Sequence, residues 1–159
     1  AMRTYSKLHR NEEGAATEIG YIFTFLLGLM LLSSFSIWVW DIETATQKRW
    51  TNEAIEENLF STSEAIERAD EAARIDPAAR YAEPVNLHLS GATGLELKMW
   101  LTDDAIHIID SGGEYSSSHA ISGAAATTHS GQLSISGIDT IWVVLDQGEV
   151  TIQTKQPGF

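Results

Sequence analysis

Residues 19–40 decide the fold: they read IGYIFTFLLGLMLLSSFSIWVW and contain no charged side chain over 22 positions. An α-helix of this length is about 33 Å long, which is close to the ~30 Å hydrocarbon core of a lipid bilayer. Such a helix needs a cover, and either lipid or other copies of the same helix can provide one. The rest of the chain is organised around this apolar segment.

The apolar segment differs from a secretory signal peptide. A signal peptide has an apolar region of about 7–15 residues followed by a cleavage site made of small residues, whereas here the run is longer and ends on Trp38 and Trp40. Tyr21 near one end and these two tryptophans near the other match the aromatic side chains that flank spanning helices at both membrane surfaces. We therefore predict a single membrane-spanning helix.

Charge is distributed unevenly about the apolar segment. The chain carries a formal net charge of −12, yet residues 1–40 contain three basic and three acidic side chains. Residues 41–80 contain ten acidic against five basic side chains, and residues 81–159 contain nine against two. Basic residues before a single span favour a cytoplasmic N-terminus. We therefore expect residues 1–14 to form a basic leader or cytoplasmic tail, and the acidic remainder to lie outside the cell.

The acidity also limits the class of partner. A surface of this charge repels phosphate, so we expect no nucleic-acid binding. It suits a protein from a halophilic source, where concentrated salt screens the repulsion among carboxylates, and it equally suits an ordinary acidic protein of the cell surface. Because the chain has no cysteine, a domain outside the cell has no disulfide and must be stabilised by its core or by its neighbours.

The helix is predicted to continue well beyond the apolar segment. Residues 41–75 contain neither glycine nor proline and are rich in good helix formers. The first break comes at Asp76-Pro77, because proline disfavours helical geometry in the residue before it. We predict one helix over residues 15–75, followed by a linker over residues 76–83.

The second half of this helix is amphipathic. Apolar side chains recur at three-, four- and seven-residue spacings, which place them on one helix face, and we expect this face to pack against the C-terminal domain. The set consists of Ile55, Leu59, Ile66, Ala69 and Ala73, with Trp50 and Ala54 extending it towards the N-terminus. Glu64 and Arg68 form an i,i+4 pair of the favourable orientation.

From residue 84 onward the apolar period changes to two, which is typical of strands. Turn residues separate the alternating runs. The predicted strands cover residues 85–89, 95–101, 105–110, 114–118, 132–136, 139–145 and 149–154. The fold class is therefore α+β: one long N-terminal helix followed, over residues 84–159, by a small antiparallel β-sheet or β-sandwich.

Three parts of this β region carry a further prediction. Residues 141–145 are apolar on both faces, so this strand is either central or in contact with another subunit. Trp100 and Trp142 are candidate contacts for a partner, and a partly covered surface position is the alternative for Trp100. Residues 116–131 are small and polar, and we expect a mobile loop or a weak edge strand there.

No motif for catalysis or cofactor binding is present, because the sequence has no glycine-rich phosphate loop, no H-E-x-x-H, no cysteine and no nucleophile elbow. We therefore expect no enzyme activity, no cofactor and no metal. The histidines of the strand region match no metal-ligand spacing and are expected to be solvated: His88, His107, His119 and His129. Asp103, Asp104 and Asp110 are expected in charged hairpin turns rather than in a calcium site.

A basic leader, a glycine, small residues, a glutamate and a long apolar helix follow one another in RNEEGAATEIGYIFTFLLGLMLLSSF (residues 10–35). With the amphipathic continuation and the β region, the chain resembles the archaeal branch of the type IV pilin superfamily, which contains archaellins and adhesion pilins. The match lies mainly in residues 10–40. In that family a membrane peptidase cuts after the leader glycine, and assembly then moves the apolar helices from the membrane into a filament core. The resemblance therefore implies cleavage between Gly14 and Ala15.

The resemblance also implies which side chains assemble. Bacterial pilins place a glutamate just inside the mature N-terminus, where it pairs with the terminal amine of a neighbour; Glu18 corresponds to it, one position early if the cut follows Gly14. The alternative role for Glu18 is an acid in the first helical turn, which favours the helix dipole. Glu12 and Glu13 stand where the archaeal pattern prefers a base before Gly14. The expected helix–helix contacts are Glu18, Tyr21, Phe25, Gly28, Leu32 and Phe35.

Two functional hypotheses follow. In the first, the chain is a structural subunit of an archaeal cell-surface filament similar to a type IV pilus, with lipid covering the helix before copies of the chain replace it. In the second, it is a permanently anchored single-span membrane protein whose outer β region binds a larger surface assembly, such as an archaellum stator-like complex, an S-layer or the membrane of a virus particle. The acids before Gly14 favour the second, and both place the C-terminal region at the cell surface.

Overall fold

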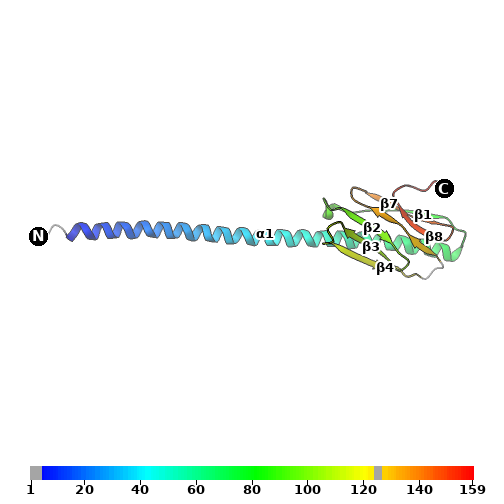
Figure 1. Cartoon of the computed structure of the whole chain (residues 1–159), viewed down its shortest axis with the longest axis horizontal. Coiled ribbons are helices and arrows are strands. Elements are labelled where there is room, and N and C mark those ends of the chain that lie inside the picture. The colour runs from blue at the N-terminus through cyan, green and yellow to red at the C-terminus, as the bar shows by residue number, and fades with distance from the viewer. Residues whose placement is uncertain (1–4, 124–126) are drawn as a thin grey trace. The chain divides into compact units, whose positions relative to one another are not determined.

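The computed structural model describes residues 5–123 and 127–159 (Figure 1), and the chain divides into two compact units, Ala1–Thr46 and Gln47–Phe159. Residues 1–4 of the predicted leader and residues 124–126 of the predicted loop lie outside the described residues. The elements are, in chain order, α1 (Tyr5–Ile75), β1 (Tyr81–Asn86), η1 (Ser90–Ala92), β2 (Leu97–Leu101), β3 (Ala105–Asp110), β4 (Ser116–Ala120), β5 (Thr128–Ser130), β6 (Gln132–Ser134), β7 (Thr140–Asp146) and β8 (Glu149–Gln153).

The helix α1 begins earlier than the sequence predicts. It starts at Tyr5 rather than at residue 15, so most of the predicted leader is helical. A single glycine costs a helix about 1 kcal/mol relative to alanine, and Gly14 therefore does not end it. In the uncut chain Glu18 does not lie in the first helical turn, which contains no acid, so its alternative role at the helix dipole is not found there.

The other end of α1 agrees with the prediction, because the helix stops at Ile75, directly before Asp76-Pro77. The linker is shorter than predicted, since β1 begins at Tyr81. Pro84, which suggested the later start, lies inside this strand. β1 pairs with β7 alone, and an edge strand tolerates proline because one side of its backbone makes no ladder hydrogen bonds.

The described strands form two four-stranded sheets, with the orders β1-β7-β8-β5 and β4-β3-β2-β6. Neighbouring strands are antiparallel except β5 and β8, which run parallel. The strand that is apolar on both faces, β7, lies between β1 and β8, so the first of its two predicted alternatives, a central strand, is the one observed. Leu145 on one face of β7 and Val144 on the other are both buried.

The region predicted as a mobile loop or a weak edge strand contributes two edge strands. β4 borders the second sheet and pairs with β3, while β5 borders the first sheet and pairs with β8 over three residues. The edge-strand alternative is therefore the one observed in the described part of residues 116–131.

One hydrophobic core joins residues 47–75 of α1 to both sheets, and Figure 1 shows this part of the helix running alongside the strands. The largest fully buried side chains come from the helix and from each sheet: Ile55, Leu59 and Ile66; Ile141, Val143, Leu145 and Val150; and Leu97, Met99, Ile106 and Ile108. The predicted α+β fold, with a long N-terminal helix followed by small, mostly antiparallel sheets, is confirmed.

Trp50 does not belong to the buried face of α1, in contrast to the prediction. Its side chain is 61% exposed, whereas Thr51 and Ala54 are buried. Residue 51 lies three and four positions before Ala54 and Ile55 and therefore shares their face. Residue 50 is rotated from it by about 100°, which turns the indole towards solvent.

Candidate functional site

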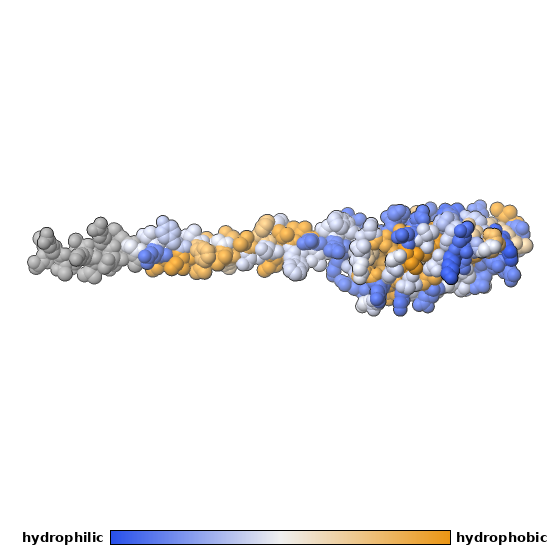
Figure 2. Space-filling view, turned by 90° about the horizontal axis from the view of Figure 1, so that it is seen from above, coloured by the Kyte–Doolittle hydropathy of each residue, from blue (hydrophilic) through white to orange (hydrophobic). Residues whose placement is uncertain are grey.

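The apolar segment (residues 19–40) presents its side chains outward along α1. Its large apolar side chains are between 44% and 74% exposed, and Figure 2 shows their surface uncovered on the face in view. Within the described residues, α1 is the helix that is long and apolar enough to cross a membrane. Soluble proteins rarely expose contiguous apolar patches larger than a few hundred Å², so this surface marks an interaction site.

The serine and threonine hydroxyl groups of the apolar segment are satisfied within the helix itself. Each donates to the backbone carbonyl four residues earlier, at 2.8 to 2.9 Å: Thr24, Ser33, Ser34 and Ser36. A hydroxyl bonded in this way needs no partner from a neighbour. The surface of the segment is therefore chemically suited both to acyl chains and to the apolar side chains of other helices.

The predicted helix–helix contacts are all exposed on this segment or just before it: Glu18, Tyr21, Phe25, Gly28, Leu32 and Phe35. Their alternating spacings of three and four place them on one helix face. At Gly28, and likewise at the predicted cleavage position Gly14, no heavy atom beyond the adjacent residues and the local helix backbone lies within 4 Å of the place that a Cβ would take. Gly14 and Ala15 lie inside α1 rather than in an extended segment.

The predicted contacts between the helix and the β domain (residues 81–159) are placed in the core. Ile55, Leu59, Ile66 and Ala69 are buried, and Ala73 is partly buried against the same cluster. We call the buried face of α1 to which they belong the docking face. Polar residues interrupt it, and these were not predicted.

Two of these polar side chains join the docking face to the backbone of the β domain. Asn58 Nδ2 donates to the carbonyl of His88 at 3.0 Å, and Asn58 Oδ1 accepts the N–H of His88 at 2.7 Å. Thr51 Oγ1 donates to the carbonyl of Gly91 at 2.8 Å. The approach at Gly91 is so close that a Cβ there would lie 2.8 Å from the carbonyl oxygen of Trp50. The seven-residue spacing of Thr51 and Asn58 was the available sequence signal.

Arg68 pairs mainly with the β domain rather than with its predicted helical partner. Its Nε and Nη2 atoms donate to Glu83 at 2.9 and 2.8 Å, while Glu64 lies 3.9 Å away. The hydroxyl of Tyr81 donates to the same carboxylate. The bonds from Arg68 lower the pKa of Glu83, and burial together with the neighbouring carboxylate raises the pKa of Tyr81.

A buried carboxylate–imidazole pair lies between α1 and β5. His129 Nε2 is 3.0 Å from both carboxylate oxygens of Asp70, and the two side chains are 1% and 5% exposed. Thr127 Oγ1 donates to Asp70 Oδ1 at 2.7 Å. On the opposite side of the ring, Nδ1 lies 3.4 Å from Asp103 Oδ1, which also accepts the backbone N–H of His129 at 2.7 Å.

The position of His129 corrects the expectation that the strand-region histidines are solvated. The other three are exposed or half-buried: His107 stacks on Trp100 with ring centres 4.8 Å apart, His119 meets the ring of Phe60 edge-on, and His88 is exposed. Among the side chains that the structure describes, no group of three or more metal-ligating residues is placed to hold an ion. Since the two ring nitrogens of His129 face different carboxylates, this cluster does not converge on a common point.

The acidic residues considered for calcium take up local roles. The Asp110 carboxylate is buried and accepts the N–H groups of Gly112 and Tyr115 at 3.1 and 2.8 Å, which closes the turn after β3. Asp103 binds His129 as described, and Asp104 is exposed. These contacts agree with hairpin turns.

The two tryptophans predicted as partner contacts lie on the outer faces of the two sheets. Trp100 stands in β2 opposite His107, and Trp142 stands in β7 opposite Pro84. Both side chains are half-buried. A hollow beside Trp100 is lined by this residue, Leu101, Gly131 and Gln132.

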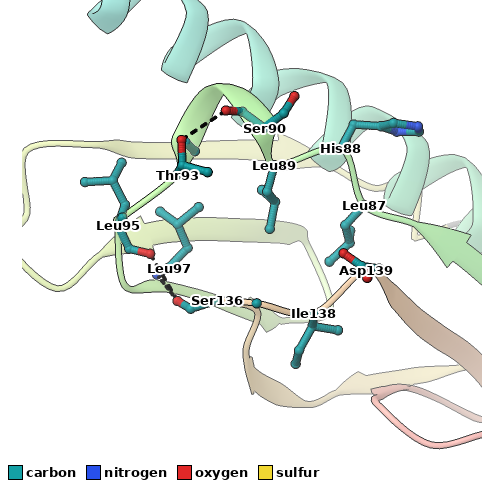
Figure 3. Close-up of a pocket in the computed structure, with 13 residues that line it drawn as sticks. Leu87, His88, Leu89, Ser90, Thr93, Leu95, Leu97, Ser136, Ile138 and Asp139 are labelled. Carbon is teal, nitrogen blue, oxygen red and sulfur yellow. Dashed lines mark hydrogen bonds between the residues drawn. The ribbon is translucent and has the colours of Figure 1, made fainter.

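A second hollow of about 670 Å³ opens beside η1 (Figure 3). Leucine side chains and Ile138 form most of its wall, and Ser136 bridges its rim by accepting the N–H of Leu97 at 2.9 Å and donating to the carbonyl of Leu95 at 3.2 Å. His88 and Asp139 are the ionisable residues of the wall. The hollow contains no nucleophile–base pair and no convergent ligand set, so the geometry favours no reaction there.

Comparisons with known proteins add no assignment to these observations. No family model, no curated protein and no solved structure matches the chain.

Proposed function

We propose that the chain is a structural subunit of a cell-surface filament that polymerises through the apolar segment, with the β domain on the outside of the polymer. One observation carries the proposal: the charge-free surface of residues 19–40 is uncovered, and the same helix continues without interruption into the docking face. A helix of this kind can anchor a subunit while its other half holds a folded domain.

The amount of exposed apolar surface on residues 19–40 indicates that this segment is buried against lipid or other subunits. Burying one large apolar side chain contributes about 1.5–3 kcal/mol. The exposed large apolar residues of the segment number more than a dozen, so covering them is worth on the order of 30 kcal/mol. Such a gain far exceeds the 5–15 kcal/mol that typically stabilises a folded domain, and we therefore do not expect a free monomer in water.

The hydrogen bonds that the hydroxyl groups make within the helix support a move of this helix from lipid into a bundle of like helices. Because the backbone and the four serine and threonine hydroxyls are bonded within the helix, moving the helix from lipid to a bundle of like helices breaks none of these hydrogen bonds. In this proposal the subunit waits in the membrane, is cut between Gly14 and Ala15, and assembles through the face that contains Phe25, Gly28 and Leu32.

The experiment combines the native N-terminus with electron microscopy. Protein isolated from its own cells should begin at Ala15 and should form filaments. Leu32→Arg should abolish the filaments, since an arginine costs roughly 2.5–3.5 kcal/mol at the centre of an apolar helix. Thr44→Arg, in an exposed helical position outside the segment, is the matched control and should assemble normally. An intact leader on protein that forms no polymer would contradict the proposal.

A permanent single-span anchor is the second candidate, and one observation favours it. α1 runs without interruption through Gly14 and Ala15, and Glu12 and Glu13 precede them, so the cleavage context is helical and acidic. In this case the β domain binds a larger surface assembly, such as an archaellum stator-like complex, an S-layer or a virus membrane. The same experiment then yields an uncut N-terminus and detergent-extracted monomers or a defined complex.

A further inference from the structure

The four outer strands of the two sheets differ in how well their edges are protected. Sheet edges expose unpaired N–H and C=O groups, which proteins commonly block with proline, charge or short strands. β5 and β6 contain three residues each, and β1 contains Pro84. β4 has five residues, and its sequence SSSHA contains neither proline nor a carboxylate, lysine or arginine. Among the described strands, β4 is therefore the least protected edge.

The pairing pattern identifies which backbone groups of β4 face away from the sheet. The N–H of Asp110 donates to the carbonyl of Tyr115, and the N–H of Ile121 donates to that of Asp104. Hydrogen-bonded and non-bonded pairs alternate along an antiparallel ladder, so the backbone groups of residues 117 and 119 face β3. Those of Ser116, Ser118 and Ala120 face outward, and no hydrogen bond to another described residue engages them. We call these three residues the free edge.

The same reasoning shows how β1 is protected. The N–H of Leu87 donates to the carbonyl of Asp139, so by alternation Ala82, Pro84 and Asn86 face outward on β1. Proline has no N–H, and here it occupies the middle position of the outward set. The corresponding middle position of β4 is Ser118, which keeps its donor.

The surface beside the free edge lacks the negative charge that dominates the rest of the chain. The strand register places ten side chains on the outer face of the second sheet, with Trp100, His107 and Ser118 in one cross-strand row. None is a carboxylate and one is a lysine: Lys98, Trp100, Ala105, His107, Ile109, Ser116, Ser118, Ala120, Gln132 and Ser134. For a chain of net charge −12, the outer face beside the free edge therefore adds no carboxylate repulsion between two edge-paired copies.

We infer that β4 pairs with β4 of a second copy of this chain, antiparallel and centred on Ser118. In this register Ser118 faces Ser118, and Ser116 faces Ala120 in both directions, so every outward N–H and C=O finds a partner. The small side chains at these positions allow the strands to approach without a clash. The two second sheets then form one continuous eight-stranded sheet across a two-fold axis.

What this pairing would do in a filament rests on the proposed function, because only then does the chain polymerise. A filament that grows in one direction repeats a head-to-tail contact, whereas this pairing is isologous and closes on itself. It therefore joins subunits of two filaments, and not neighbours along one filament. The β4 edge is in this sense a lateral-association site.

The absence of native cysteine allows a direct test by disulfide trapping of the full chain in detergent micelles, where no filament is needed. The two Ser118 Cα atoms of a hydrogen-bonded pair lie about 5.5 Å apart, within the roughly 4.4–6.8 Å that a disulfide requires. Ser118→Cys should cross-link about tenfold faster than Ser134→Cys, which lies on the same face but in β6. Ser116→Cys mixed with Ala120→Cys should form the heterodimer in preference to either homodimer.

A blocking variant separates pairing from chance collision. Ser118→Pro is added to both the Ser116→Cys chain and the Ala120→Cys chain, so that β4 carries a proline at the position where β1 carries one. This change removes an outward N–H donor without removing a β3–β4 hydrogen bond. The cross-linked heterodimer should then be lost. Circular dichroism establishes that the variant is folded, and Ser118→Lys provides the same block if it is not. Equal cross-linking of Ser118→Cys and Ser134→Cys, or a heterodimer that survives both blocks, overturns the inference. Failure to form filaments would contradict only the proposed function.

Discussion

Replacing His129 with leucine should strongly destabilise the packing of α1 on the β domain. In the intact protein the Asp70 carboxylate is 5% exposed and has the imidazole of His129 at 3.0 Å from both oxygens. After His129→Leu, Thr127 is the remaining side chain that donates to it among the described residues. Breaking a buried pair by removing one partner costs about 3–5 kcal/mol, because a buried charge is left uncompensated.

The assay is thermal unfolding of the full chain in detergent, followed by near-ultraviolet circular dichroism. For a domain of roughly this size, 1 kcal/mol shifts the melting temperature by about 4 °C, so His129→Leu should lower it by roughly 12–20 °C. The double variant Asp70→Leu with His129→Leu should lose less than the single one, since removing both partners leaves no buried carboxylate without its imidazole. Asp103→Asn is the matched control, because this side chain is 69% exposed, and it should cost less than about 1 kcal/mol.

Two results would refute this reasoning. If His129→Leu changes the free energy of unfolding by less than about 1 kcal/mol, the contact between Asp70 and His129 does not stabilise this packing. If the double variant loses as much as the sum of the two single variants, the two side chains act independently despite their contact.

Three further changes test other parts of the packing. Leu59→Ala should cost about 2–5 kcal/mol in urea unfolding, because the side chain is 1% exposed in the core; a loss below about 1 kcal/mol would show that the docking face is loosely packed. Gly91→Ala should cost roughly 1–3 kcal/mol, since a Cβ would lie 2.8 Å from a backbone oxygen of α1, whereas the exposed neighbour Ser90→Ala should be neutral. Arg68 lowers the pKa of Glu83 below its ordinary 4.5, so this carboxylate stabilises the fold above that pH and the contribution is lost as the pH falls through the lowered value. Glu83→Gln should therefore flatten the fall in melting temperature in acid, and an unchanged acid profile would contradict the pairing.

Some features could be read from the sequence because their causes are local. The apolar segment follows from 22 consecutive uncharged residues, and the helix ends at Ile75 because Pro77 restricts the residue before it. The strands follow from an apolar period of two and from turn residues between the runs. Two element boundaries differ from the prediction. The helix α1 continues through Gly14 and begins at Tyr5, and β1 begins at Tyr81 and contains Pro84, which an edge strand tolerates.

The candidate sites divide in the same way. Helical spacing identified the apolar residues of the docking face but not Asn58 and Asp70. A polar residue interrupts the apolar pattern, and the sequence does not show which distant residue it binds. Asp70 and His129 are 59 residues apart, and only the tertiary structure brings them together.

The sequence by itself determined where the chain is apolar, where its long helix ends and which stretches are extended, since hydropathy, proline geometry and side-chain alternation act over a few residues. Only the tertiary structure decided which histidine is buried, which glutamate Arg68 binds, that Trp50 faces away from the core and that β4 keeps an open edge. These depend on strand order and on contacts between distant residues, and no local rule fixes either.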